Sequence, residues 1–310
     1  MILEHERIWI DPAYRTALTE AGLSSVTSVL GTLGDRLAAW SRTTDTVYIS
    51  LPRSNLAVFL KRYHYPRWSS RMRLAFRGTL VQSSRAKSEY RVLAAMRRWG
   101  IQAVRPIAWG EQRLYGLVRS CFLITEAVPE AMSLATFIHR YGHGLVRGAA
   151  GEADNGRPAR DRKLGLPEWA AIEAKRSILI NLARQVRFMH DAGFVHRDLF
   201  WRNVLIRPLP NREFEFYFLD ASVGRRIRVK QWRRESIVRD LAALGVMAPE
   251  FCSRADQLRF IRNYLGTDQI GDQERQWLEA VQARSRALRA TEEQRMERQG
   301  VFDRIDASAA

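Results

Sequence analysis

The chain has 310 residues, 46% of them hydrophobic, which is enough apolar material for one large domain or two lobes and excludes a disordered protein. Its formal net charge of +17 predicts attraction to an anionic partner: nucleic acid, acidic lipid headgroups or a phosphorylated glycolipid. The two cysteines, Cys121 and Cys252, lie far apart without metal-ligand spacing, so neither a disulfide framework nor a zinc site is expected.

The beginning of the chain has no apolar core followed by a cleavage site, so it does not have the pattern of a signal peptide. No uncharged run approaches the length needed to span a bilayer. We therefore expect a soluble, cytoplasmic protein. Residues 1–34 are expected to form a helical cap, because Trp9, Tyr14 and Leu18 are interspersed with polar residues and glycines follow.

Three strand-like runs follow the cap, at residues 37–40, 46–51 and 56–63. The turn between the first two, residues 41–45, contains no glycine, although loops that cover nucleotide phosphates usually need one for close backbone approach. In its place, Arg42 and Thr43 are the candidate phosphate donors.

The third strand carries a candidate nucleotide-binding lysine, Lys61, which alternation places on the same face as Phe59. Residues 84–99 are expected to form a helix in which Glu89 lies on the apolar side, because Val92, Leu93 and Met96 follow it at helical spacing. A buried carboxylate needs a partner, and Lys61 is the natural one. The alternatives are that Lys61 is a lysine at the edge of a sheet and that Glu89 is a partly exposed glutamate.

The run at residues 121–124 predicts a buried strand that ends before Pro129, where a hinge between two lobes would fall. Backbone groups of Glu126 and Val128 are candidates for holding an adenine edge. A helix is then expected from residue 167 to residue 191, with apolar residues at helical spacing.

Residues 196–203, with the sequence His-Arg-Asp-Leu-Phe-Trp-Arg-Asn, have the layout of a phosphotransferase catalytic loop. One carboxylate, Asp198, would accept the proton of an attacking hydroxyl, and the amide oxygen of Asn203 would hold a metal on the nucleotide phosphates. The alternative is a chance match, because turns are rich in Asp and Asn.

A hairpin is expected next, with strands at residues 204–206 and 213–220. Asp220 ends its second strand on the same face as Phe216 and Phe218, and is a candidate second metal ligand. Its alternative is a strand-ending aspartate in a turn.

Taken together, Lys61, Glu89, Asp198, Asn203 and Asp220 resemble the protein-kinase-like fold in their order and spacing. More narrowly, the chain resembles the lipopolysaccharide core kinases, which phosphorylate Kdo or heptose of the inner core. The segments that carry this resemblance are residues 58–63, 89–93, 196–203, 218–220, 239–244 and 258–265.

The resemblance implies an α+β fold with a small β-rich N-lobe, residues 35–125, and a larger, mainly helical C-lobe, residues 126–272. It implies an ATP-dependent kinase that uses Mg2+ and acts on a hydroxyl of an inner-core sugar. Lys61 would orient the phosphates, Glu89 would hold Lys61, and Asp240 would bind the backbone of the catalytic loop. Asn203 matches ordinary kinases, whereas heptose-phosphorylating members often have a histidine there, so the sugar stays open.

Between Asp220 and Asp240 the chain is strongly basic, which fits either the phosphates of an acidic glycolipid or an anionic membrane surface. The expected partners are thus an acidic glycolipid or sugar acceptor and the inner face of the cytoplasmic membrane, and nucleic acid is not expected. Residues 273–310 predict a mixed-charge helical tail that lies on the surface.

Two other functions are compatible with the same residues. A protein Ser/Thr kinase would need a peptide-docking segment after Asp220, where the chain is short and basic. A catalytically silent kinase-like module that binds membrane or nucleic acid would use the basic segment and not Asp198.

Overall fold

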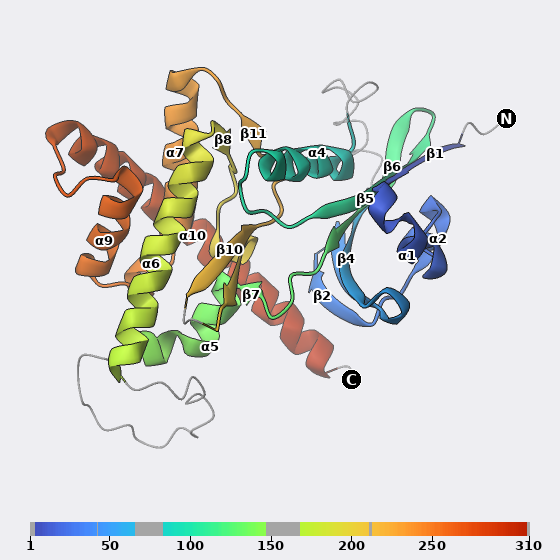
Figure 1. Cartoon of the computed structure of the whole chain (residues 1–310), viewed down its shortest axis with the longest axis horizontal. Coiled ribbons are helices and arrows are strands. Elements are labelled where there is room, and N and C mark those ends of the chain that lie inside the picture. The colour runs from blue at the N-terminus through green and yellow to red at the C-terminus, as the bar shows by residue number, and fades with distance from the viewer. Residues whose placement is uncertain (1–3, 42, 66–82, 147–167, 211–212, 309–310) are drawn as a thin grey trace. The chain divides into compact units, whose positions relative to one another are not determined.

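The computed structural model of the protein describes residues 4–41, 43–65, 83–146, 168–210 and 213–308 (Figure 1). The chain forms two compact units. Unit 1 comprises Met1–Pro129 and Phe218–Gly224, and unit 2 comprises Glu130–Tyr217 and Arg225–Ala310.

This division differs from the expected lobes in one functional respect, because the segment with Asp220 belongs to unit 1. The cause is backbone pairing: the N–H of Phe218 donates to the carbonyl of Gln102, and the N–H of Val104 donates to the carbonyl of Phe218. The expected boundary after residue 125 lies close to the observed one after Pro129.

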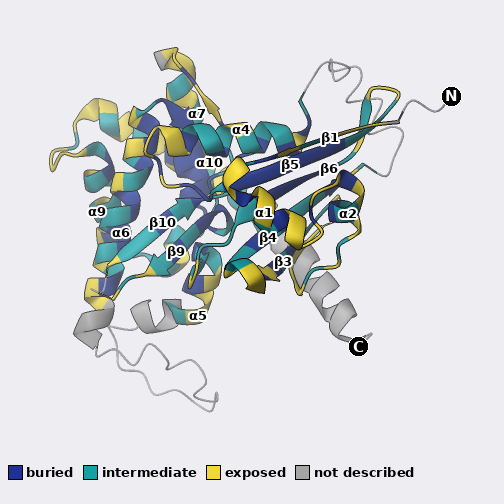
Figure 2. Ribbon diagram, turned by 45° about the vertical axis from the view of Figure 1, so that its right-hand side comes forward, coloured by how far each residue is buried: buried dark blue, intermediate teal, exposed yellow. Residues whose placement is uncertain are grey.

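Unit 1 is built on a six-stranded antiparallel sheet with the order β1-β5-β6-β4-β3-β2. Figure 2 shows that its central strands are largely buried. The strands are β1 (Glu4–Ile10), β2 (Arg36–Trp40), β3 (Thr44–Leu51), β4 (Leu56–His64), β5 (Pro106–Leu114) and β6 (Leu117–Glu126). The helical segments of unit 1 are η1 (Pro12–Tyr14), α1 (Arg15–Glu20), α2 (Val26–Gly31), η2 (Pro52–Ser54) and α4 (Arg85–Arg98).

The two faces of strand β4 meet different partners, as its alternation predicts. Val58 and Leu60 are fully buried in a cluster that includes side chains of α1 and α2. Lys61 and Tyr63 contact Glu89 of helix α4 on the other face. The alternation therefore separates an apolar core from a polar group that a helix covers.

The expectation of a purely helical N-terminal cap at residues 1–34 is wrong in its first part. Residues Glu4–Ile10 form strand β1, which pairs with β5 along its whole length. Ile8 and Ile10 are more buried than Trp9 between them, which is the period-two pattern of a strand. Nor are the helices peripheral, because Leu18 and Val29 are fully buried in the core cluster of unit 1.

Unit 2 is mainly helical and contains a three-stranded sheet, β10-β9-β7, and a two-stranded sheet, β11-β8. The strands are β7 (Met132–Ser133), β8 (Phe194–Val195), β9 (Val204–Pro208), β10 (Phe214–Phe218) and β11 (Arg225–Arg226). The helices are α5 (Leu134–Val146), α6 (Glu168–Asp191), η3 (Trp201–Asn203), α7 (Lys230–Gly245), α8 (Ala248–Phe251), α9 (Arg254–Leu265) and α10 (Asp272–Ser308).

Helix α6 leads into the predicted catalytic loop, residues 196–203. Its buried residues Leu182, Val186 and Met189 follow helical spacing, as predicted. Gly193, with φ +84°, then turns the chain into β8, because glycine adopts this left-handed conformation without steric cost.

The tail at residues 273–310 is more than a solvated surface. It forms most of helix α10, which packs against α7 within unit 2 (Figure 1). Val281 is buried, and the guanidinium of Arg289 donates to the carbonyl of Val246. The first half of the tail therefore packs on unit 2 through a few of its residues.

Candidate functional site

In unit 1, the ammonium of Lys61 lies between two carboxylates. Its Nζ is 3.3 Å from Oε2 of Glu89 and 2.6 Å from Oδ1 of Asp220. The predicted Lys61–Glu89 pair is therefore confirmed, and Asp220 joins it. Glu89 is 2% exposed, so its carboxylate lies inside the unit beneath the lysine.

The charges of this cluster depend on one another. Burial raises the pKa of Glu89, and Lys61 opposes this effect. Burial alone would lower the pKa of Lys61, but the carboxylates of Glu89 and Asp220 outweigh it, so the net shift is upward. Lys61 is thus held as a cation, the form that binds phosphate oxygens.

Tyr63 is a member of this cluster that the sequence analysis missed. Its hydroxyl donates to Oε2 of Glu89, and burial raises the pKa of the phenol well above its ordinary value. Tyr63 stands two positions after Lys61 on the same strand, so alternation could have identified it.

Unit 2 brings together Asp198 and Asn203. The Nδ2 group of Asn203 donates to both the carbonyl and Oδ2 of Asp198, each at 2.8 Å. The Asp198 side chain is 34% exposed, so a substrate hydroxyl can reach it. Asn203 is the last residue of helix η3, five positions after Asp198.

Arg202 and Glu292 are two further residues near Asp198 that the sequence analysis did not single out. A terminal nitrogen of Arg202 is 3.6 Å from Oδ1 of Asp198, and Nη1 lies 2.6 Å from Oε2 of Glu292 on α10. The pairing partner is ninety positions away in the sequence, so no local pattern could reveal it.

Asp240 holds the backbone of the catalytic loop, as the resemblance implied. It is fully buried, and its carboxylate accepts hydrogen bonds from the backbone N–H groups of His196 at 2.7 Å and Arg197 at 2.5 Å. Nε2 of His190 lies 3.2 Å from the same carboxylate. Arg197 has φ +67°, which is uncommon for a residue with a Cβ, so these bonds fix the loop in a strained conformation.

The remaining predicted nucleotide contacts stay predictions. Arg42 lies outside the described residues, and Thr43 is exposed. The N–H of Glu126 donates to the carbonyl of Arg105, and its carboxylate accepts from Tyr14. An adenine contact at this position would therefore involve the carbonyl of Glu126 or the backbone of Val128.

Asp220 in unit 1 and Asn203 in unit 2 each carry an oxygen that suits a magnesium ion by its chemistry. Because Nδ2 of Asn203 donates hydrogen bonds to Asp198, the side-chain oxygen of Asn203 is the atom left to face a ligand. Carboxylate and amide oxygens are hard donors of the kind Mg2+ takes, together with phosphate oxygens from a nucleotide. Among the described residues, no group of three or more His, Cys, Asp or Glu could hold a metal by itself.

The predicted residues thus fall into two sets. Lys61, Glu89 and Asp220 meet in unit 1, and Asp198 and Asn203 meet in unit 2. That both sets act on one nucleotide stays a prediction.

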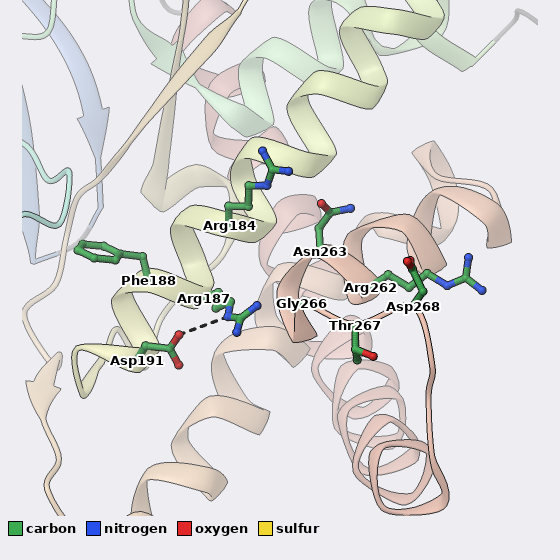
Figure 3. Close-up of a pocket in the computed structure, with 9 residues that line it drawn as sticks. All are labelled: Arg184, Arg187, Phe188, Asp191, Arg262, Asn263, Gly266, Thr267 and Asp268. Carbon is green, nitrogen blue, oxygen red and sulfur yellow. Dashed lines mark hydrogen bonds and ion pairs between the residues drawn. The ribbon is translucent and has the colours of Figure 1, made fainter.

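A separate basic hollow lies in unit 2, between α6 and α9 (Figure 3). Its volume is about 460 Å³, and it contains Arg184, Arg187 and Arg262. None of the predicted site residues lines it. Two aspartates, Asp191 and Asp268, also line the hollow. Nε of Arg187 is 3.3 Å from Oδ2 of Asp191, so part of the positive charge of the hollow is compensated.

Comparison with known proteins identifies relatives of the chain. The model of the Lipopolysaccharide kinase (Kdo/WaaP) family matches residues 29–152 and 164–264. The lipopolysaccharide core heptose(I) kinase WaaP of Pseudomonas aeruginosa is 25% identical over 185 residues, which are 58% of this chain and 59% of that protein. The enzyme of the same name from Escherichia coli K12 is 28% identical over 189 residues, 56% of this chain and 61% of that protein.

The chain spans about three-fifths of the length of these curated relatives. A solved structure of WaaP in complex with acyl carrier protein covers 91% of this chain and 99% of its own, with a TM-score of 0.58 and 20% identity. This likeness confirms the expected α+β fold. In the described parts of the chain, no helix has the length and apolar character needed to cross a membrane.

Proposed function

Because the chain belongs to the Lipopolysaccharide kinase (Kdo/WaaP) family, we propose that it transfers the γ-phosphoryl group of ATP to a hydroxyl of an inner-core sugar, Kdo or heptose. The observation that carries this proposal is the cluster in which Lys61 is paired with buried Glu89 and with Asp220. A lysine held in this way is the group that kinases use to orient nucleotide phosphates.

In the proposed reaction, Asp198 takes the proton of the sugar hydroxyl. The hydroxyl oxygen forms a bond to the γ-phosphorus, the bond from that phosphorus to the oxygen bridging to the β-phosphate breaks, and ADP leaves. Asn203 fixes Asp198 by one hydrogen bond to its carboxylate and one to its backbone carbonyl, and Lys61 binds phosphate oxygens. Asn203 and Asp220 would hold Mg2+, which neutralises charge on the phosphates when it is bound.

Exposed apolar residues and neighbouring arginines at the start of α7 support a lipid-linked acceptor. Trp232 and Val229, at the start of α7, are 63% and 51% exposed, and the basic residues Arg228 and Arg234 flank them in the sequence. Exposed tryptophan beside arginine suits the interface of an anionic membrane. We propose peripheral membrane contact here, which Trp232→Ala should weaken in sedimentation with anionic vesicles and leave unchanged with neutral ones.

Unit 2 also contains an apolar cavity of about 780 Å³, lined by residues of α6, α7, α9 and α10 such as Leu182, Leu241 and Ile261. Its size lies in the usual range for ligand sites. Since the similar WaaP was solved in complex with acyl carrier protein, we propose that this cavity takes an acyl chain.

One experiment separates the proposed function from its two rivals. The purified protein is incubated with γ-labelled ATP and Mg2+, and with either dephosphorylated core oligosaccharide or a generic protein acceptor. Label in the sugar supports the proposed function, and label in the protein supports a Ser/Thr kinase. Absence of transfer to either acceptor would favour a silent binding module.

A further inference from the structure

Three arginines converge on the backbone of the catalytic loop in unit 2. Arg197 is part of the loop itself, one position before Asp198. Arg225 is paired in register with Val195, two positions before Arg197, through the antiparallel ladder of β11 and β8. Arg239 immediately precedes Asp240, whose carboxylate accepts the N–H of Arg197.

Burial, and after it the like charges of Arg225 and Arg239, lower the pKa of Arg197, the effect expected of guanidinium groups that repel one another. On β11, Arg226 donates from Nε to the carbonyl of Ala192, and alternation turns Arg225 to the opposite side of the ribbon.

The charge of Asp240 offsets only part of the positive charge of this cluster. No carboxylate in the described part of the chain forms an ion pair with the guanidinium of Arg197, Arg225 or Arg239. Asp240, the nearby acid, is already engaged by two backbone N–H groups and by His190. Three neighbouring cations that repel one another lower the stability of the protein unless an anion binds them.

We propose that Arg197, Arg225 and Arg239 form a binding site for an anionic group of the acceptor, a carboxylate or a phosphate close to the hydroxyl that is phosphorylated. Guanidinium groups bind the paired oxygens of either group with two parallel hydrogen bonds. The cluster would thus select acidic sugars over neutral ones. This inference rests on the proposed function, because it assigns the acceptor to that same site.

The test compares steady-state kinetics of wild type, Arg225→Gln and Arg239→Gln. A hydrogen bond to a charged group contributes about 1.5–3 kcal/mol, which corresponds to roughly tenfold or more in affinity. Each variant should raise KM for the core oligosaccharide about tenfold and leave kcat and the KM for ATP within about twofold. Arg284→Gln, an exposed arginine on α10 with the same change in charge, should behave as wild type.

Three acceptors identify the anion: a core oligosaccharide that lacks only the phosphate to be added, the same material treated with phosphatase, and a carboxyl-reduced form. With wild type, KM should rise for the form that lacks the recognised group, and the double variant Arg225→Gln/Arg239→Gln should no longer distinguish the forms. Unchanged KM for the acceptor in both single variants, or a rise confined to ATP, would overturn the inference.

A separate measurement keeps the inference distinct from the proposed function. If wild type transfers no phosphate, the proposed function fails, and the arginine site is judged by calorimetric binding, without nucleotide, of the core oligosaccharide that lacks only the phosphate to be added. Binding at least tenfold weaker in the double variant than in Arg284→Gln supports the site. Equal binding by the two contradicts it.

Discussion

Lys61 and Asp220 form an ion pair of 2.6 Å although they lie in distant parts of the sequence. Asp220 has φ +54°, an uncommon conformation for an aspartate, at the end of the segment that pairs with Gln102 and Val104. In the proposed reaction each partner has a competing ligand, phosphate for Lys61 and magnesium for Asp220. We therefore expect this pair to break when nucleotide and magnesium bind.

Removing Lys61 should destabilise the protein more than its exposure suggests. Lys61→Met leaves Glu89 buried without its cation, and breaking a buried pair in this way costs roughly 3–5 kcal/mol. The double variant Lys61→Met/Glu89→Gln leaves no buried charge, so it should be more stable than Lys61→Met alone. Urea unfolding at pH 7 measures the free energy of unfolding of these variants. A loss of stability in the double variant equal to the sum of the losses in the two single variants would contradict the pairing.

Asp240 should act on activity through the loop that it holds. Asp240→Ala leaves the N–H groups of His196 and Arg197 without their acceptor, and each such buried group costs about 1–3 kcal/mol. We expect a lower melting temperature, a fall in kcat and little change in the KM for ATP. Glu235→Gln, an exposed acid on the same helix, is the control. A wild-type kcat in Asp240→Ala would show that the loop does not need this brace.

The two thiols should react slowly in the folded protein. Burial raises the pKa of both Cys121 and Cys252 to about 11, so at pH 8 roughly a hundredfold fewer thiolates are present than at an ordinary pKa near 9. Because the folded pKa is the higher one, stability should fall as the pH rises from about 9 to about 11. Alkylation by iodoacetamide, followed by mass spectrometry, should label both only after unfolding in urea. Rapid labelling of the native protein would contradict the burial.

The apolar cavity of unit 2 should bind a fatty acyl chain. A fluorescent long-chain fatty acid should bind wild type and lose affinity in Leu241→Trp, which fills the space. Leu37→Trp, on an exposed strand of unit 1, controls for the added indole. Equal binding by the two variants would remove this cavity as the acyl site. Recovery of acyl carrier protein with the purified wild type would identify it as the protein that carries the acyl chain.

Local pattern was sufficient where a residue's neighbours in sequence decide its environment. The alternation of β4 placed Lys61 opposite Leu60, and the helical spacing after Glu89 placed that carboxylate on the buried side of α4. Both assignments depend only on the period of an element. The same reasoning could have found Tyr63, which shares the face of Lys61.

Pattern failed where the partner is distant in the sequence. Strand β1 pairs with β5, about a hundred positions away, so local spacing does not distinguish its residues from the predicted helical cap. The contact of Arg202 with Glu292 depends on α10 packing against α7 within unit 2. The spacing of residues in the sequence does not predict this packing. The position of Asp240 under the loop came from the resemblance and not from its own neighbourhood.

The proposed function requires Asp198 to be the base for phosphoryl transfer to an inner-core sugar. Asp198→Asn keeps the size of the side chain, so the folded protein and its affinity for ATP with Mg2+ should be unchanged. General base catalysis contributes about 10²–10⁴-fold, so transfer of labelled phosphate to dephosphorylated core oligosaccharide should fall about a thousandfold. Transfer by Asp198→Asn at more than a tenth of the wild-type rate would contradict this role of Asp198.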